Sequence, residues 1–226
     1  MKKLVIAIDG PVAAGKSTVA KRLARELGYV YMDTGAMYRA VAWRLKAAGV
    51  EPGDERELKR ILEEMRIELR DMDGDLRVLL GGADITEEIR TPEISQRASQ
   101  VSTFKAVREK MVELQRAMGR DGGVVAEGRD IGTVVFPQAD VKIYLDASPQ
   151  ERARRRFEEL RSKGGEVPLE ETLKEMEERD RRDRERELAP LSKAQDAIVI
   201  DSTNFGVDRV VERIMQEIKK KMAANP

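Results

Sequence analysis

The fold is decided by an eight-residue stretch, Gly10-Pro11-Val12-Ala13-Ala14-Gly15-Lys16-Ser17, which matches the pattern G-x-x-x-x-G-K-[ST]. It follows the apolar run Leu4–Ile8 and precedes a helical pattern in which Val19, Leu23 and Leu27 recur every four residues. Glycines let the backbone curl, so that successive N–H groups and the start of the helix point at one anion. The stretch therefore predicts a strand, a phosphate-binding loop and a helix.

In this pattern the lysine neutralises the β- and γ-phosphates of a nucleoside triphosphate, and the hydroxyl that follows it ligates Mg²⁺. We expect Lys16 and Ser17 to have these roles, although the neighbouring hydroxyl of Thr18 is an alternative ligand. The expected triphosphate-binding residues of the loop are Gly10, Pro11, Val12, Ala13, Ala14, Gly15, Lys16, Ser17 and Thr18.

Acidic residues follow three of the expected strands. Asp9, Asp33 and Glu127 each stand at a carboxyl end, the edge where open α/β sheets bind ligands. Any of them would support Mg²⁺ directly or through water, or would instead cap a helix or pair with an arginine. The sequence leaves these alternatives open.

Four further apolar runs predict the rest of a parallel sheet: Tyr29–Met32, Val124–Ala126, Val141–Leu145 and Ala197–Ile200. Their nearly continuous apolar character is typical of strands covered on both faces. Helical patterns lie between them, over residues 107–118 and 210–218 among others. The chain is thus expected to have an α/β fold, a P-loop nucleotide-binding core with a five-stranded parallel sheet flanked by helices.

Two regions interrupt this alternation. Residues 52–97 predict a helix over Leu58–Met65, an antiparallel hairpin within 67–80 with its turn at Asp73-Gly74, and a helix opened by Thr91-Pro92. Residues 151–187 contain 12 Lys and Arg and 13 Asp and Glu. So many charges predict a solvated pair of helices or a mobile flap, with its turn at Lys163-Gly164-Gly165.

Composition excludes several classes of function. The 226-residue chain is 41% hydrophobic and 37% charged, as expected of a folded domain, and has neither Cys nor His, which excludes disulfides, thiolate nucleophiles and Ser-His-Asp triads. Its 42 basic and 42 acidic residues and 4% aromatic content argue against a nucleic-acid partner. No run approaches the length of a membrane span, and the short apolar run after Lys2 and Lys3 is interpreted as a strand rather than an export signal. We expect a cytoplasmic monomer without a membrane partner.

Further polar motifs are hard to explain by packing. Asp33-Thr34-Gly35-Ala36-Met37-Tyr38-Arg39 begins where the second expected strand ends. Later come Ser99-Gln100-Val101 with Arg108, then the glycine-rich stretch 128–137, and finally the arginine-rich stretch 179–186 before Ala189-Pro190-Leu191.

In their joint order, these motifs resemble the bacterial cytidylate kinases, within the P-loop nucleoside monophosphate kinases. The resemblance runs over essentially the whole chain and includes IDGPxxxGKST, D[ST]GAxYR, EIRT, GRDxGTVVFP and ERDxRDxxRxxAPL. It implies transfer of the γ-phosphoryl group of ATP, with Mg²⁺, to CMP or dCMP. It also implies a core of residues 1–37, 98–150 and 188–226, a monophosphate-binding insert of 38–97 and a lid of 151–187.

The resemblance also implies roles for single residues. Lys16, Arg129, Arg179 and Arg186 would be catalytic, and Arg155 would join the phosphate loop in binding ATP. The monophosphate would contact Thr34, Tyr38, Arg39, Ser99, Arg108, Arg129, Asp130, Asp183 and Arg186.

Within that set, the base would be read by Ser99, Arg108 and Asp130, since a carboxylate accepts from the cytosine amino group that uracil lacks. Asp183 would bind the sugar, and the arginines would hold the α-phosphate. The acceptor is already an anion, so such an enzyme needs no histidine base.

Two other classes stay open at this stage. One is a kinase for a small molecule or for another monophosphate, such as UMP or AMP. The other is a nucleotide-dependent switch or an ATPase that acts on nucleic acid, against which the composition stands.

Overall fold

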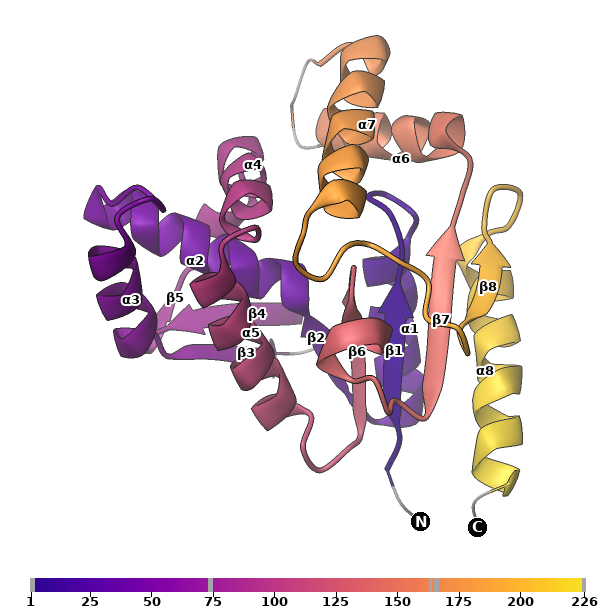
Figure 1. Ribbon diagram of the computed structural model, residues 1–226. Helices are drawn as coiled ribbons and strands as arrows, with labels where there is room; N and C mark the ends of the chain where they lie inside the picture. The colour runs from indigo at the N-terminus through magenta and orange to yellow at the C-terminus, as the bar shows by residue number, and fades with distance from the viewer. Residues whose placement is uncertain (1–2, 73–74, 163, 165–166, 225–226) are drawn as a thin grey trace.

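A parallel sheet of five strands runs through the computed structural model, which describes residues 3–72, 75–162, 164 and 167–224 (Figure 1). The strands follow the order β2-β6-β1-β7-β8 and every neighbouring pair is parallel. They are β1 (Val5–Asp9), β2 (Val30–Asp33), β6 (Val124–Gly128), β7 (Val141–Asp146) and β8 (Ile198–Asp201). The five apolar runs of the sequence form this sheet, and the expected α/β fold is confirmed.

Helices connect the strands and cover the sheet. They are α1 (Lys16–Leu27), α2 (Thr34–Ala48), α3 (Glu55–Glu64), α4 (Pro92–Val101), α5 (Lys105–Met118), α6 (Pro149–Ser162), α7 (Leu169–Glu185) and α8 (Val207–Ala224), with short helical turns η1 (Glu88–Arg90) and η2 (Ile131–Val135). Within the described ranges, no helix has both the length and the apolar character needed to cross a bilayer.

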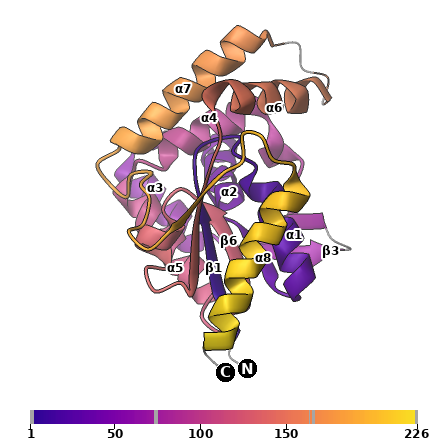
Figure 2. The same ribbon diagram turned by 90° about the vertical axis from the view of Figure 1, so that its right-hand side faces the viewer.

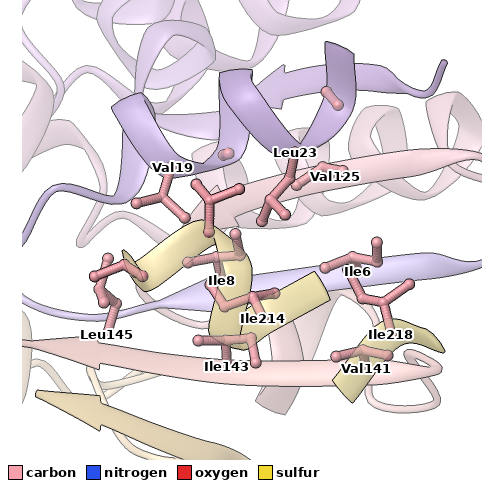
Figure 3. Packing of buried hydrophobic residues seen from close by; sticks show 14 of the residues in the cluster. Ile6, Ile8, Val19, Leu23, Val125, Val141, Ile143, Leu145, Ile214 and Ile218 are labelled. Atoms are coloured by element: carbon pink, nitrogen blue, oxygen red, sulfur yellow. The ribbon is translucent and has the colours of Figure 1, made fainter. Parts of the chain in front are cut away.

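The central strand β1 is buried on both faces because its side chains alternate between them. Ile6 and Ile8 pack against Leu23 of α1 and Ile214 of α8 (Figure 3). Ala7 belongs to a second cluster with residues of β2, β6 and η2. Full burial of one such aliphatic side chain contributes about 1.5–3 kcal/mol. The strand that leads into the phosphate loop is therefore held from both sides.

The insert between β2 and α5 has a hydrophobic cluster of its own. It is built by α2, α3, α4, α5 and the strands β3 (Ile67–Met72) and β4 (Asp75–Leu80), which form an antiparallel sheet with the exposed β5 (Ala83–Asp84). The expected hairpin strands are confirmed, whereas its turn at Asp73-Gly74 lies outside the described residues. Thr91 caps α4, as expected, by accepting the Ile94 N–H at 3.2 Å. Leu76 of β4 packs into the main core, which joins the insert to the sheet.

Helices α6 and α7 lie beyond the carboxyl ends of the strands, where both views place them (Figures 1 and 2). Of their expected turn, only Gly164 lies within the described residues. The expected pair of helices is present, but it is not solvated throughout, since Arg152, Asp180 and Asp183 are no more than 5% exposed. Each of these three charges is buried against an opposite charge, a pairing that the local sequence does not reveal.

Candidate active site

The phosphate loop joins β1 to α1 with a backbone that suits glycine. A Cβ on Gly10 would lie 1.9 Å from the carbonyl oxygen of Leu145, so no larger residue fits there. Gly15 precedes α1 with a φ of 93°, and no side chain caps the helix. The first N–H groups of α1 are therefore free of side-chain partners at the end of the helix that favours an anion.

Lys16 is buried at the first position of α1. Its Nζ donates to the carbonyl oxygen of Pro11 at 2.6 Å. Burial, together with the nearby charges of Arg129 and Arg179, lowers the pKa of Lys16 to about 7, although Glu127 opposes this shift. A buried ammonium among other cations is stabilised by an anionic ligand, which this position would supply from a bound phosphate.

Glu127 is the acidic residue that faces the loop. The Ser17 hydroxyl donates to its Oε1 at 2.5 Å, and the Tyr31 hydroxyl donates to the same oxygen at 2.9 Å. Glu127 is 5% exposed, and its charge is one cause that raises the pKa of Tyr31, after burial. Of the two hydroxyls considered from the sequence, that of Ser17 is the one beside a carboxylate.

Asp9 and Asp33 have other partners. The carboxylate of Asp9 accepts the N–H groups of Ile131 and Gly132 at 2.8 and 2.7 Å, and burial raises its pKa to about 6. Asp33 caps α2 through the Ala36 N–H at 2.8 Å and pairs with an arginine. Both are thus structural contacts, and Glu127 is left as the carboxylate nearest the expected metal ligand.

One cavity of about 1230 Å³ extends from the phosphate loop to the insert. Cavities that hold one small ligand measure about 300–1,000 Å³, so this one has room for two nucleotides. Every residue predicted for the site lines it except Gly10, Pro11 and Arg108. The structure therefore brings together predicted positions that are up to 174 residues apart in the sequence, from Val12 to Arg186.

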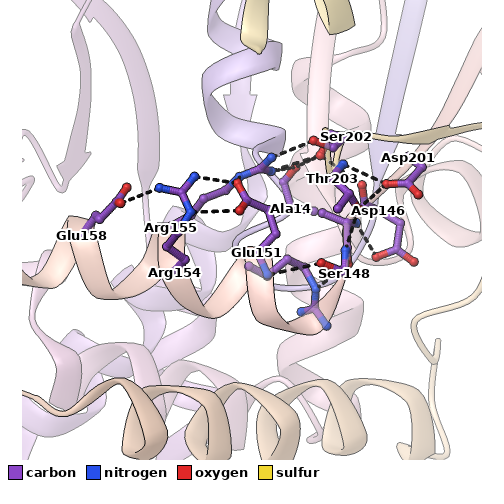
Figure 4. A network of polar contacts seen from close by, with 12 residues as sticks. Ala14, Asp146, Ser148, Glu151, Arg154, Arg155, Glu158, Asp201, Ser202 and Thr203 are labelled. Carbon is purple, nitrogen blue, oxygen red and sulfur yellow. Dashed lines mark hydrogen bonds and ion pairs between the residues drawn. The ribbon is translucent and has the colours of Figure 1, made fainter. Parts of the chain in front are cut away.

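At one end of the cavity, Arg155 of α6 lies against the phosphate loop (Figure 4). Its Nη1 donates to the Ser202 hydroxyl at 3.0 Å and to the Ala14 carbonyl at 3.4 Å, and its Nη2 donates to the Ser202 carbonyl at 2.7 Å. Glu151 accepts from its Nε at 2.9 Å. Arg155 is therefore held beside the loop by Ser202, which follows β8, by Ala14 of the loop itself and by Glu151 of α6.

The middle of the cavity is strongly cationic. Arg129 donates to the carboxylate of Asp183 at 2.8 Å, which keeps the pKa of Arg129 high against the effect of burial. Among the described residues Arg179 forms no such ion pair, and burial, together with the charge of Arg129, lowers its pKa to about 10. Within the described part of the chain, the Nε atoms of Arg39 and Arg179 are buried without a hydrogen-bond partner.

In this middle region there are more arginine side chains than carboxylates that pair with them. Asp33 pairs with Arg39 at 2.9 Å and Asp183 with Arg129, whereas Arg179 forms no ion pair in the described structure and has only the nearby Asp183, already paired with Arg129, to offset its charge. Guanidinium groups prefer the planar oxygens of phosphate and carboxylate. The unmatched charge and the free Nε donors fit an anionic group between the two ends of the cavity.

At the insert end, Asp130 forms the centre of a buried polar cluster. Arg186 donates to its Oδ1 at 3.2 Å and Arg108 pairs with its Oδ2. Arg108 does not line the cavity; it lies behind Asp130 and over the ring of Tyr38, 5.7 Å from its centroid. The Ser99 hydroxyl is buried with no partner in the described structure. This end offers a donor, an acceptor and a ring in one place.

Thr34 joins the two parts of the site. Its hydroxyl donates to the carbonyl oxygen of Glu127 at 2.7 Å, and it lines the cavity from the first position of α2. A Cβ on the neighbouring Gly128 would lie 2.6 Å from this hydroxyl. Gly128 thus leaves the space that the Thr34 side chain occupies.

A model of the family described as cytidylate kinase matches residues 6–220. The chain belongs to the cytidylate kinase family. The cytidylate kinase of Syntrophotalea carbinolica is 50% identical over 220 residues, which are 97% of this chain and 94% of that protein. The cytidylate kinase of Pelotomaculum thermopropionicum is 52% identical over 214 residues, which are 94% and 95% of the two chains.

A solved structure of an uncharacterized protein from Eubacterium ventriosum has a TM-score of 0.54 and 14% identity, and covers 96% of this chain and 99% of its own. This likeness concerns the fold alone. The family membership confirms the resemblance stated from the motifs, and it makes this chain a kinase, a phosphotransferase.

The motifs did not predict that two buried charged residues, Arg152 and Asp180, hold the backbone of the phosphate loop. Asp180 accepts the backbone N–H of Val12 at 3.0 Å, and Arg152 donates to the carbonyl of the same residue at 3.0 Å. Asp180 belongs to the motif ERDxRDxxRxxAPL, but its contact with the loop, like the burial of both charges, is visible in the structure alone.

Proposed function

We propose that this chain transfers the γ-phosphoryl group of ATP to CMP or dCMP, giving ADP and the corresponding diphosphate. The observation that carries the proposal is the single cavity in which Lys16, Arg129 and Arg179 lie between the phosphate loop and a second polar pocket. A triphosphate on the loop would direct its terminal phosphate at the acceptor. The names of the curated relatives support the choice of cytidylate as the acceptor.

In this proposal the arginines and Lys16 supply most of the catalysis. The transferred phosphoryl group passes through a loose transition state whose negative charge spreads over its equatorial oxygens. Lys16, Arg129, Arg179 and Arg186 surround the position of that group and are already held in the cavity, so little reorganisation is needed. The acceptor oxygen belongs to a phosphate anion, and no side chain has to remove its proton.

The residues present fit a Mg²⁺ ion bound to the triphosphate. Mg²⁺ prefers oxygen ligands and usually takes one or two from the protein, with phosphates and water completing its shell. The Ser17 hydroxyl would be the direct ligand, and Glu127 would orient it and accept from a metal-bound water. The ion would draw charge from the β- and γ-phosphates. No cluster of three or more acidic side chains suited to a metal occurs among the described residues, which agrees with a site completed by substrate.

The acceptor would lie at the insert end. Asp130 would accept from the cytosine amino group and the unpartnered Ser99 hydroxyl would add a second contact to the base, while Arg108 would act by holding Asp130. Tyr38 would form a wall of the base pocket. Asp183 would receive the sugar hydroxyl.

The acceptor phosphate would be bound by Arg39, Arg129 and Arg186, with Thr34 as a further contact. In the same proposal, residues 38–97 form the monophosphate-binding insert, 151–187 the lid, and 1–37, 98–150 and 188–226 the core. A closed lid would exclude water, which otherwise competes as the acceptor. The enzyme would act as a cytoplasmic monomer in pyrimidine nucleotide metabolism.

A substrate panel tests the proposal. Initial rates of ADP formation are measured with ATP and Mg²⁺ while CMP, dCMP, UMP, AMP or GMP is offered in turn. We expect kcat/KM for CMP or dCMP to exceed that for every other acceptor. Preference for a purine would overturn the assignment, as would ATP hydrolysis that RNA stimulates and no monophosphate accelerates.

A further inference from the structure

The peptide of Val12, in the middle of the phosphate loop, is held on both sides by charged side chains of the lid. Its N–H donates to Asp180 Oδ1 of α7 at 3.0 Å. Its carbonyl oxygen accepts from Arg152 Nη1 of α6 at 3.0 Å. The same nitrogen of Arg152 lies 2.5 Å from Asp180 Oδ2. A closed ring of hydrogen bonds thus joins the backbone of one loop residue, through the two peptide groups that flank its Cα, to both lid helices.

The ring is buried and anchored to the core. The side chains of Arg152 and Asp180 are 5% and 2% exposed, and Arg152 Nε donates to the carbonyl oxygen of Ala147, which follows β7, at 3.1 Å. Most other ion pairs of α6 and α7 are more exposed to solvent than this one. For example, Arg181 and Glu185 are 63% and 67% exposed and their charged atoms lie 4.0 Å apart. Exposed pairs contribute little, whereas removal of one partner from a buried pair costs several kcal/mol.

The position of the ring connects the two halves of the site. Val12 lines the cavity at the phosphate loop, while Asp180 follows Arg179 directly and is one helical turn from Asp183. A carboxylate so close to the loop would repel phosphate unless a cation balanced it, and Arg152 supplies that balance. Neither residue lines the cavity, so neither is placed to touch a nucleotide.

We propose that Asp180 and Arg152 are positioning residues that fix the Val12 peptide in the orientation the triphosphate requires. The contact of the two lid helices with Val12 thereby determines the backbone conformation of the phosphate loop. The inference rests on the proposed function only where it names ATP as the ligand of the loop. Its expected consequence is selective, since loss of the ring weakens binding of the donor more than binding of the acceptor.

Two measurements test the inference, and the first needs no substrate. Backbone amide exchange of Val12 is followed by NMR in the unliganded protein. We expect this amide to be protected, and to exchange at least tenfold faster in Asp180→Ala, because its only acceptor in the described structure is lost. Unprotected exchange of Val12 in the unchanged protein would overturn the inference without touching the proposed function.

The second measurement compares nucleotide binding by calorimetry. In Asp180→Ala the dissociation constant of ATP is expected to rise about tenfold and that of CMP less than threefold, since a small misplacement of the loop weakens the contacts that phosphate makes with it. Asp180→Asn retains an oxygen for the Val12 N–H but not the charge, and should regain part of the ATP affinity. Glu185→Ala, an exposed carboxylate on the same helix, is the matched control and should leave both constants within twofold.

A purely structural role predicts a different pattern. If the ring only stabilised the fold, the variants would melt earlier while the folded fraction bound ATP and CMP as before. The inference would be overturned if Asp180→Ala, Asp180→Asn and the control Glu185→Ala had the same dissociation constant for ATP. Equal losses of affinity for ATP and for CMP in Asp180→Ala would also overturn it. If Asp180→Ala fails to fold, the same comparison is made with Asp180→Asn and Arg152→Lys, for which a smaller loss of ATP affinity is expected that still exceeds the loss of CMP affinity.

Discussion

Replacement of Arg186 by alanine should lower the turnover of the enzyme far more than the stability of its fold. Arg186 is 5% exposed at its side chain, donates to Asp130 at 3.2 Å and donates through Nε to the carbonyl oxygen of Ala189 at 2.7 Å. A hydrogen bond to a neutral group contributes about 1 kcal/mol and one to a charged group about 1.5–3 kcal/mol. The lost contacts therefore set an upper limit of about 3–4 kcal/mol on the cost in stability.

Two effects reduce this cost. Burial is the main cause that lowers the pKa of Arg186, so the charged side chain is partly destabilised in the folded state and its removal recovers that desolvation. Asp130 also keeps Arg108 as its partner. We therefore expect a net loss of about 1–2 kcal/mol, which lowers the melting temperature of a chain of this size by roughly 2–8 °C.

The effect on turnover should be much larger. An arginine that stabilises a transferring phosphoryl group contributes about 10³–10⁵ in rate. Arg186→Ala should accordingly lower kcat by at least about 10³, or roughly 4 kcal/mol. A coupled assay of ADP formation with saturating CMP gives kcat, and differential scanning fluorimetry gives the melting temperature.

Arg181→Ala is the matched control on α7, because this arginine is 63% exposed and, among the described residues, its one ion pair spans 4.0 Å. It should change stability by less than about 0.5 kcal/mol and kcat by less than about twofold. If Arg186→Ala loses equal free energy in stability and in turnover, Arg186 is a structural residue and its assigned role is refuted.

Three further substitutions give independent checks. Asp9→Asn should reduce the pH dependence of stability. Burial raises the pKa of Asp9 to about 6, so the contribution of Asp9 to the free energy of unfolding is lost as pH rises through that value. In urea titrations the free energy of unfolding of the unchanged protein, relative to that of the variant, should fall by ~1 kcal/mol from pH 5 to 7.5, and parallel pH curves would contradict this. Glu127→Gln should raise the Mg²⁺ concentration for half-maximal rate about 10-fold, since the Ser17 hydroxyl loses a charged acceptor, and an unchanged Mg²⁺ titration would refute that role. Gly128→Ala should cost about 1–3 kcal/mol, because the added Cβ would lie 2.6 Å from the Thr34 hydroxyl, and an unchanged melting temperature would show that the site adapts.

Much of the fold follows from local pattern. The sheet strands were predictable because a buried parallel strand needs a continuous apolar run, as in Val141–Leu145. The helix after Thr91-Pro92 was predictable because its first turn needs a hydroxyl acceptor and tolerates proline. Each of these signals involves residues only a few positions apart, so it can be recognised in a single sequence.

The buried charges of α6 and α7 were not predictable in this way. Arg152 and Asp180 are 28 residues apart, and the Val12 peptide that they hold is 168 residues from Asp180. Composition alone assigns such charges to the solvent, and only the fold shows that they neutralise each other. The pairing of Arg108 with Asp130, 22 residues apart, was likewise visible only in the structure, and the contact of Arg108 with the base stays a prediction.

Transfer of a labelled phosphate tests the central claim most directly. ATP labelled with ³²P at the γ-position is mixed with excess enzyme, Mg²⁺ and CMP for a single turnover, and the products are separated by chromatography. The account predicts that the label appears in CDP, with little free phosphate, because the second pocket of the cavity presents an acceptor in place of water. Label released mainly as inorganic phosphate, at a rate that CMP does not change, would contradict it.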